Sequence, residues 1–202
     1  MRSPSGQGPR ALYELPAPIA PLNAVRGTIL ALDWRALREA SVFEPYKAAL
    51  EPTLREALLS ATAGSWVPVD LVLAHYRALD ALHLDEARAH QVGWSVGNGA
   101  HGAFLLTLIR LAGVLGVSPW SALEQSYKLW VRSWRGGAIA VHRLGDRLAE
   151  VSLRQVGVCG SHFFRASFAG ALCAGIAPFC EAPSAGEVAP ARDSVDYRVT
   201  WR

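Results

Sequence analysis

Hydrophobic and polar positions follow a helical period through most of the first two thirds of the chain. In residues 45–61, apolar side chains recur every three or four positions, with Glu51, Arg55 and Glu56 elsewhere around the helix. The apolar positions of this stretch are Tyr46, Ala49, Leu50, Leu54, Ala57 and Leu58. Similar spacing predicts further helices at 26–37, 69–82, 85–94, 103–115 and 121–135. The pattern therefore predicts an N-terminal layer of helices.

The period changes after Gly136. Residues 138–142 and 147–153 are short alternating runs joined by Leu144-Gly145-Asp146, which is typical of a hairpin. Residues 161–179 are apolar enough for a helix packed across that sheet, and residues 195–201 alternate strictly. The predicted class is α+β, with an N-terminal helical layer followed by a small C-terminal antiparallel sheet with an inserted helix. Strands are expected only in this last third.

The chain divides into a short leading segment and one domain. Residues 1–24 are rich in proline, glycine and serine and carry only scattered apolar side chains, which predicts a flexible tail or a loosely docked extension. Residues 25–202 have the size of a single α+β domain. No internal repeat is found.

Composition narrows the class further. With 51% hydrophobic and 18% charged residues, the chain can bury a sizeable core, which argues against disorder throughout. The net charge of +3 comes from arginines, with only Lys47 and Lys128 as lysines, and is more typical of genome composition than of a binding task. The start of the chain lacks the apolar run of an export signal, so a cytoplasmic protein is predicted. The apolar segment 103–115 is too short to span a membrane.

A glycine cluster lies between the predicted helices at 85–94 and 103–115. Residues 97–102 match the pattern GxGxxG, but a dinucleotide site needs those glycines directly after a strand, and the preceding segment is helical in character. The favoured interpretation is that Gly93, Gly97 and Gly102 permit close helix packing or a kink, and that Asn98-Gly99 forms a turn.

Histidines and cysteines offer no clear metal or catalytic pattern. Cys159, Cys173 and Cys180 lack CxxC spacing; His162 would complete a Cys3His zinc set, but buried reduced thiols are favoured and no metal is predicted. His101 stands between the glycine cluster and an apolar helix and could point into a pocket. No activated nucleophile or carboxylate pair is evident, so an enzyme is the minority interpretation.

Nucleic-acid binding is also disfavoured. Several arginines between 132 and 165 are interleaved with tryptophan and phenylalanine, a combination that can contact phosphates and stack on bases. Asp146 and Glu150 fall inside the same stretch, and the aromatic residues have the spacing of a protein core. No nucleic-acid partner is therefore predicted.

Several short segments carry a family resemblance. Val25-Arg26-Gly27-Thr28, Gly93-Trp94-Ser95-Val96-Gly97 and the ending at residues 193–201 resemble a family of proteins of this size found mainly in myxobacteria. The helix with Phe168-Ala169-Gly170-Ala171-Leu172, followed by a closing hairpin, resembles the C-terminal half of the 4-vinyl reductase and haem nitric-oxide-binding superfamily. That resemblance implies a mixed helical and antiparallel domain that encloses a small, largely apolar ligand.

The chain departs from both branches of this superfamily. The haem-binding branch holds the haem propionates with a Tyr-x-Ser-x-Arg motif, and no such motif occurs here. The vinyl reductase branch carries several C-terminal cysteines, and the cysteine expected in the last turn is replaced by Asp193-Ser194-Val195. The resemblance thus supports the fold more than a ligand, and the cofactor, haem or metal included, stays open.

Together these observations predict a non-enzymatic domain with a sensory or regulatory role that binds a small apolar ligand between the helical layer and the C-terminal sheet. The residues predicted to line this pocket are Trp94, His101, Phe104, Trp130 and Trp134. The alternative is a protein-interaction or scaffold module without ligand, in which the apolar excess covers a protein partner or a second copy in a homodimer.

Overall fold

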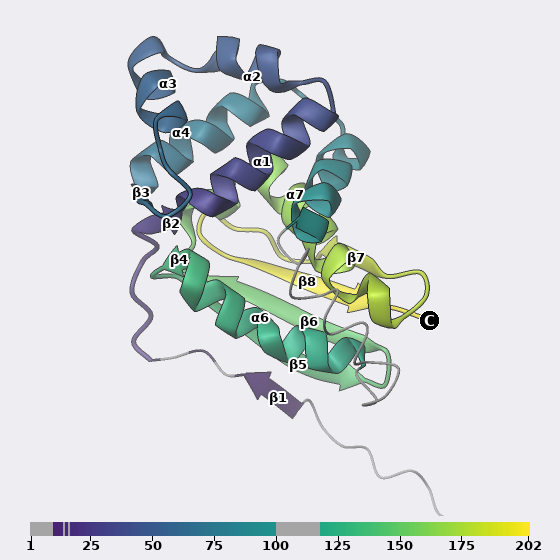
Figure 1. Ribbon diagram of the computed structural model, residues 1–202. Coiled ribbons are helices and arrows are strands. Elements are labelled where there is room, and N and C mark those ends of the chain that lie inside the picture. The colour runs from purple at the N-terminus through teal and green to yellow at the C-terminus, as the bar shows by residue number, and fades with distance from the viewer. Residues whose placement is uncertain (1–9, 14, 16, 100–117) are drawn as a thin grey trace, which may run out of the picture.

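Two layers make up the fold, a helical layer and a five-stranded antiparallel sheet (Figure 1). The computed structural model describes residues 10–13, 15, 17–99 and 118–202. The helical layer contains α1 (Gly27–Glu39), α2 (Phe43–Ala49), α3 (Pro52–Leu59), α4 (Val69–Asp80) and a helix whose described part covers residues 86–99. The predicted α+β class is confirmed. Within the described ranges, no helix has the length and apolar content to cross a membrane.

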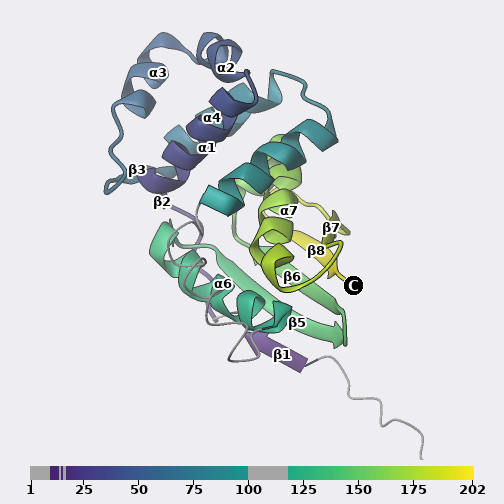
Figure 2. The same cartoon turned by 45° about the vertical axis from the view of Figure 1, so that its right-hand side comes forward.

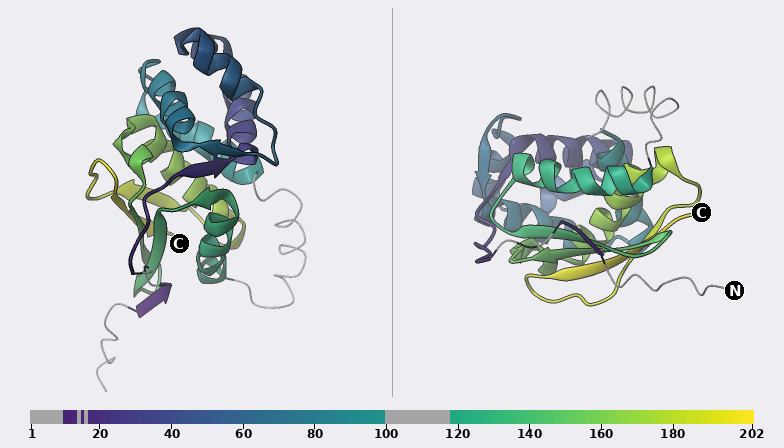
Figure 3. Two further views of the ribbon diagram at one scale, coloured as in Figure 1. Left: turned by 90° about the vertical axis from the view of Figure 1, so that its left-hand side faces the viewer. Right: turned by 90° about the horizontal axis from the view of Figure 1, so that it is seen from below.

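The main sheet has the strand order β1-β5-β6-β8-β7. Its strands are β1 (Arg10–Tyr13), β5 (Ala138–Gly145), β6 (Leu148–Arg154), β7 (Ser184–Glu187) and β8 (Val195–Thr200). Two long helices, α6 (Pro119–Ser133) and α7 (His162–Ile176), lie against this sheet, and the helical layer lies beyond α7 (Figures 2 and 3). The core therefore runs from the sheet through α6 and α7 into the helical layer.

A second, three-stranded sheet connects distant parts of the chain. It consists of β3 (Trp66–Pro68), β2 (Ala24–Arg26) and β4 (Trp134–Arg135), all antiparallel. Val25 pairs with Val67 on one side and with Trp134 on the other, and all three are buried. The expectation that strands occur only in the last third of the chain is therefore wrong, because strands of two to four residues are too short to show an alternating pattern.

The predicted helix over residues 45–61 is divided into α2 and α3. Leu50 and Glu51 have extended backbone angles, and α3 begins at Pro52. A residue that precedes proline is sterically driven away from the helical region, whereas proline itself is well suited to the first turn of a helix. The apolar spacing continues across the break, which is why periodicity alone did not reveal it.

The helix at residues 86–99 packs on α7 at backbone distance. A Cβ on Gly93 would collide with the carbonyl oxygen of Ser167, and one on Gly170 would collide with the carbonyl oxygen of His90. Gly97 also packs tightly on α7, at Ala171 and Ala174, although less closely than Gly93. The close packing predicted for Gly93 and Gly97 is confirmed, and Gly102 lies outside the described residues. Residues 98 and 99 are helical, so the predicted turn there is wrong.

The carboxylate of Asp80 joins α4 to the start of α7. Its Oδ1 accepts hydrogen bonds from the backbone N–H of Phe163 at 2.8 Å and from the hydroxyl of Ser161 at 3.0 Å. Ser161 in turn accepts from the backbone N–H of Phe164 at 3.1 Å. A negative charge at this position satisfies free N–H groups and complements the helix dipole. The contact therefore fixes the helical layer on the C-terminal half.

The leading segment is partly ordered on the domain. Residues 10–13 form β1, and the chain is anchored again by hydrogen bonds from Gly137 N to Ala20 O at 2.7 Å and from Leu22 N to Gln155 O at 2.8 Å. The division of the chain at residue 25 stays a prediction.

Candidate functional site

Two of the predicted ligand-lining residues form a parallel aromatic pair. Trp130 lies in the last turn of α6 and Trp134 begins β4, four residues later. Their ring centroids are 4.8 Å apart with an angle of 7° between the planes. Both side chains belong to the core, with 5% and 8% of their surface exposed. Trp134 lies just beyond the end of α6, with extended backbone angles, so helical spacing alone does not account for this contact.

Rings from α7 extend this pair into a larger cluster. Phe164 lies 6.0 Å from Trp134 in an edge-to-face arrangement, and Phe168 lies 5.6 Å from Phe164. Trp130, Trp134, Phe164 and Phe168 are called the aromatic cluster below. Phe164 also contacts Tyr76 of α4, at 5.1 Å, so the cluster reaches from α6 to the helical layer.

One polar atom of the aromatic cluster lacks a partner. The indole Nε1 of Trp130 is buried and has no hydrogen-bond acceptor in the described part of the chain. A buried donor without an acceptor costs about 1–3 kcal/mol of stability. An oxygen atom of a bound molecule placed beside Nε1 would remove this cost.

Of the other predicted lining residues, Trp94 alone lies in the described part of the chain. Trp94 is half-buried on the helix at residues 86–99, and among the described side chains its ring contacts neither Trp130 nor Trp134. His101 and Phe104 lie outside the described residues. Two hollows lined by described residues lie elsewhere: one of about 10 Å³ beside Arg165 and Tyr197, and an open one of about 330 Å³ over Phe43.

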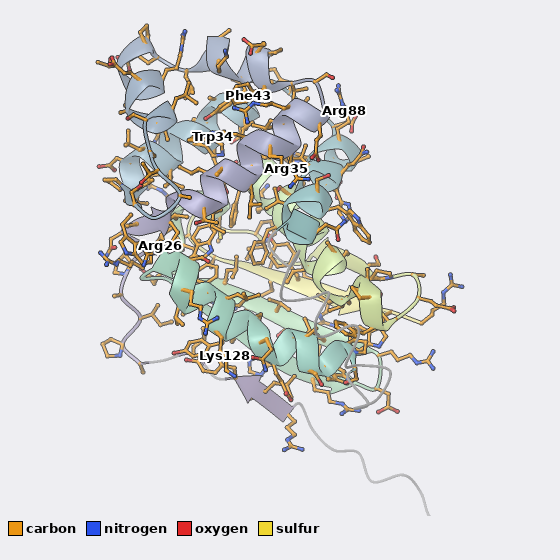
Figure 4. All side chains as sticks on the ribbon, viewed as in Figure 1. Arg26, Trp34, Arg35, Phe43, Arg88 and Lys128 are labelled. Atoms are coloured by element: carbon orange, nitrogen blue, oxygen red, sulfur yellow. The ribbon has the colours of Figure 1, made fainter. Side chains whose placement is uncertain are left out.

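A buried polar network, not anticipated from the sequence, crosses the helical layer. Tyr46 Oη lies 2.7 Å from Nδ1 of His75, and His75 Nε2 lies 3.3 Å from Oδ2 of Asp33. The hydroxyl of Tyr76 donates to the same carboxylate oxygen at 3.4 Å. Trp34, labelled on α1 in Figure 4, donates to Tyr46 Oη at 3.4 Å. Burial raises the pKa of Tyr46 and that of Tyr76, with the charge of Asp33 acting in the same direction on both.

Tyr46, His75 and Asp33 follow one another as a hydroxyl, a base and a carboxylate that orients the base, which is the arrangement of an activated nucleophile. Tyr46 and His75 are fully enclosed, however, and Asp33 is buried with them. A substrate cannot reach a hydroxyl in such a position. The network therefore stabilises the packing of α1, α2 and α4. A sequence signal did exist, because Asp33 and His75 occupy core positions of the helical pattern, beside Leu30 and Leu37 and beside Val72 and Leu79.

Several arginines of the aromatic-rich stretch are engaged within the protein. Arg154 pairs with Asp196 at 2.7 Å, and Arg165 pairs with Glu187 at 2.6 Å. The guanidinium groups of Arg26 and Arg135 lie 4.1 and 4.2 Å from the ring centre of Trp66, on the small sheet; Figure 4 labels Arg26 there. These arginines, which lie near aromatic residues in the sequence, therefore make ion pairs or cation–π contacts within the protein.

The described residues do not make up a haem site. His75, the buried histidine among them, is engaged at both ring nitrogens, and no group of three or more metal-binding side chains occurs in the same ranges. The propionate motif Tyr-x-Ser-x-Arg is incomplete: Ser133 and Arg135 have its spacing, but Val131 stands at the tyrosine position and is 48% exposed. Arg135 lies over Trp66.

Comparison of the sequence with protein-family models and with curated proteins found no match. Solved structures do match the fold. An oxygen-binding H-NOX (haem nitric-oxide/oxygen-binding) domain related to soluble guanylate cyclases has a TM-score of 0.59 and 12% identity, over 88% of this chain and 95% of that chain.

Two further H-NOX structures agree with this likeness. A variant from T. tengcongensis has a TM-score of 0.59 at 11% identity, over 88% of this chain and 97% of that chain. The Fe(II) unliganded protein from K. algicida has a TM-score of 0.58 at 10% identity, over 88% of this chain and 96% of that chain. The resemblance to the haem nitric-oxide-binding superfamily is therefore confirmed at the level of the fold.

Proposed function

We propose that this protein is a sensory or regulatory domain that binds a small, largely apolar molecule at the aromatic cluster. The observation that carries the proposal is the stacked pair Trp130 and Trp134 beside an indole Nε1 that lacks an acceptor among the described residues. The H-NOX fold supports the assignment, because the similar structures include an oxygen-binding domain. The proposal includes no catalytic step.

The pair is suited to such a ligand for two physical reasons. Stacked indole rings form a rigid apolar wall, and close packing of an apolar ligand against them gains dispersion energy. The single free donor then orients a ligand that carries one polar group. The cofactor stays open, and His101 is proposed as a further lining residue together with Phe104 and Trp94.

The test is native mass spectrometry of the freshly purified full chain, with an absorption spectrum of the same sample. We expect a mass excess that disappears on denaturation, and a lower bound fraction in Trp134→Ala. The matched control is Trp120→Phe, since Trp120 forms an edge-to-face pair with Trp201 and donates its N–H to Asp146 O. A native mass equal to that of the bare chain, together with no absorption beyond that of the aromatic residues, would overturn the proposal.

A haem ligand is distinguished within the same experiment. A Soret band that is lost in His101→Ala would identify the ligand as haem held by His101. A mass excess without a Soret band would identify a different small molecule, and both outcomes support ligand binding.

A further inference from the structure

The outer edge of β5 is closed by a strand from the leading segment. β1 runs antiparallel to β5, with Arg10 opposite Arg143, Ala11 opposite His142 and Tyr13 opposite Val141. The other edge of β5 pairs with β6 along its length. β1 contributes four residues to a neighbour of eight, and the pairing shifts between Ala11 and Tyr13. β1 is thus a short and irregular partner for this edge (Figure 1).

Two like charges face each other across the pair formed by β1 and β5. Arg10 faces Arg143, and like charges directly opposite in an antiparallel pair are destabilising. Arg143 binds Asp146 at 3.0 Å and lies 4.8 Å from the ring centre of Trp120. Arg10 has no acidic partner among the described residues. A strand with an acidic residue in place of Arg10 would pair better with β5.

The aromatic contact of β1 is specific, in contrast. The ring of Tyr13 stacks on Tyr127 of α6, with centroids 3.7 Å apart and 21° between the planes. Loss of water contact and the neighbouring Tyr127 raise the pKa of Tyr13 to about 12. Tyr127 therefore provides a docking position for one aromatic side chain on an arriving strand.

The connection to the domain leaves β1 free to be exchanged. After Tyr13, the backbone hydrogen bonds seen in the described part of the chain resume at Ala20 and Leu22. Pro16 and Pro18 fall in the connecting residues and cannot donate backbone hydrogen bonds. Release of β1 therefore leaves the anchor at Ala20 to Asn23 in place.

We propose that the edge of β5 is a docking surface for an extended segment of a partner protein, which replaces β1. Backbone hydrogen bonds to β5 would give affinity, an aromatic side chain on Tyr127 would fix the register, and an acidic side chain facing Arg143 would give selectivity. This surface gives the interaction-module alternative a specific location, and it does not depend on ligand binding at the aromatic cluster.

The test uses the full chain with the substitutions Ala11→Cys and His142→Cys, whose Cα atoms face each other across the pair. Oxidation fixes β1 on β5, and reduction of the same sample is the matched control. The probe is a fluorescent peptide with the sequence of residues 8–15 carrying Arg10→Glu, followed by anisotropy. Because a tethered strand competes at an effective concentration in the millimolar range, peptide is added up to a few millimolar.

We expect saturable binding to the reduced protein, loss of binding after oxidation and recovery on reduction. The unsubstituted peptide should bind roughly two- to fivefold more weakly, the size expected for one cross-strand charge pair. Equal binding to both redox forms, or no binding to the reduced form, would overturn the proposal. A disulfide between two chains would overturn it in favour of strand exchange between copies.

A second variant tests the same surface without a disulfide. Arg10→Glu in the full chain should strengthen the β1 pairing and weaken binding of the acidic peptide by a similar factor. Unchanged binding to that variant counts against the charge argument.

Discussion

Tyr46 Oη and His75 Nδ1 lie 2.7 Å apart in the middle of the helical layer, and neither residue has any exposed surface. Trp34 Nε1 can only donate, so Tyr46 Oη accepts from Trp34 and gives its own hydrogen to Nδ1. The imidazole hydrogen is then on Nε2, where it faces Asp33 Oδ2. This assignment satisfies every donor in the network.

Removal of the Tyr46 hydroxyl tests that assignment. Tyr46→Phe leaves Trp34 without an acceptor and His75 Nδ1 without a donor, both buried. We expect the free energy of unfolding to fall by about 1–3 kcal/mol in urea titrations. Tyr76→Phe is the matched control, because Asp33 keeps the hydrogen bond from His75 and no donor is stranded. The assignment fails if the two variants lose equal stability.

Backbone contact between α7 and the helix at residues 86–99 gives a second prediction. Gly93→Ala forces the two helices apart, since the new methyl group would overlap the Ser167 carbonyl. Overpacking of this kind costs about 1–3 kcal/mol or more. Gly186→Ala, where no atom lies within 4 Å of the added carbon, is the comparison. Similar urea midpoints for both variants would show that the helices do not pack this closely.

The Asp80 carboxylate gives a third prediction, for the junction between α4 and α7. Asp80→Ala removes the acceptor of Phe163 N and Ser161 Oγ, and we expect a loss of about 1–2 kcal/mol in unfolding free energy. Asp70→Ala provides the control, because Asp70 is exposed in the first turn of α4. Hydrogen exchange should quicken at the start of α7 in Asp80→Ala alone. Unchanged exchange there would contradict the capping role.

The sequence alone predicted those elements of the fold whose local pattern of apolar residues matches the face that they bury. The alternation at residues 195–201 corresponds to β8, and the helical spacing at residues 121–135 corresponds to α6. Periodicity of this kind reflects one face turned to the core, so it can be seen without knowing the partner. The class α+β followed from the order of these elements.

The remaining features depend on partners far away in the sequence. β2 pairs with strands at residues 66–68 and 134–135, and three residues contain no period that would indicate this. Phe164 and Phe168 were not predicted because α7 is apolar on all sides, and such a helix does not reveal which side faces Trp134. The assignment of Trp94 to the pocket stays a prediction, because an aromatic residue in a glycine-rich segment gives no pattern that shows which way its ring points.

Thiol reactivity gives the last prediction. Burial raises the pKa of Cys159 to about 12 and that of Cys173 to about 11, from an ordinary value of 9.0, and it raises the pKa of half-buried Cys180 as well. Only Cys180 should therefore react with a thiol reagent at pH 8, slowly, and all three cysteines should react in urea. Cys180→Ser should abolish the native reaction.

The same shifts set a direction for stability. A thiol whose pKa is higher in the folded state holds its proton more tightly there, so its contribution is complete below pH 9 and is lost as the pH rises from 9 towards 11 for Cys173. The urea midpoint should fall over that range, and less steeply in Cys173→Ala. Rapid native labelling of Cys173, or a midpoint whose pH dependence is identical in the alanine variant, would show that this thiol is accessible to water and that α7 is packed less closely on its neighbours.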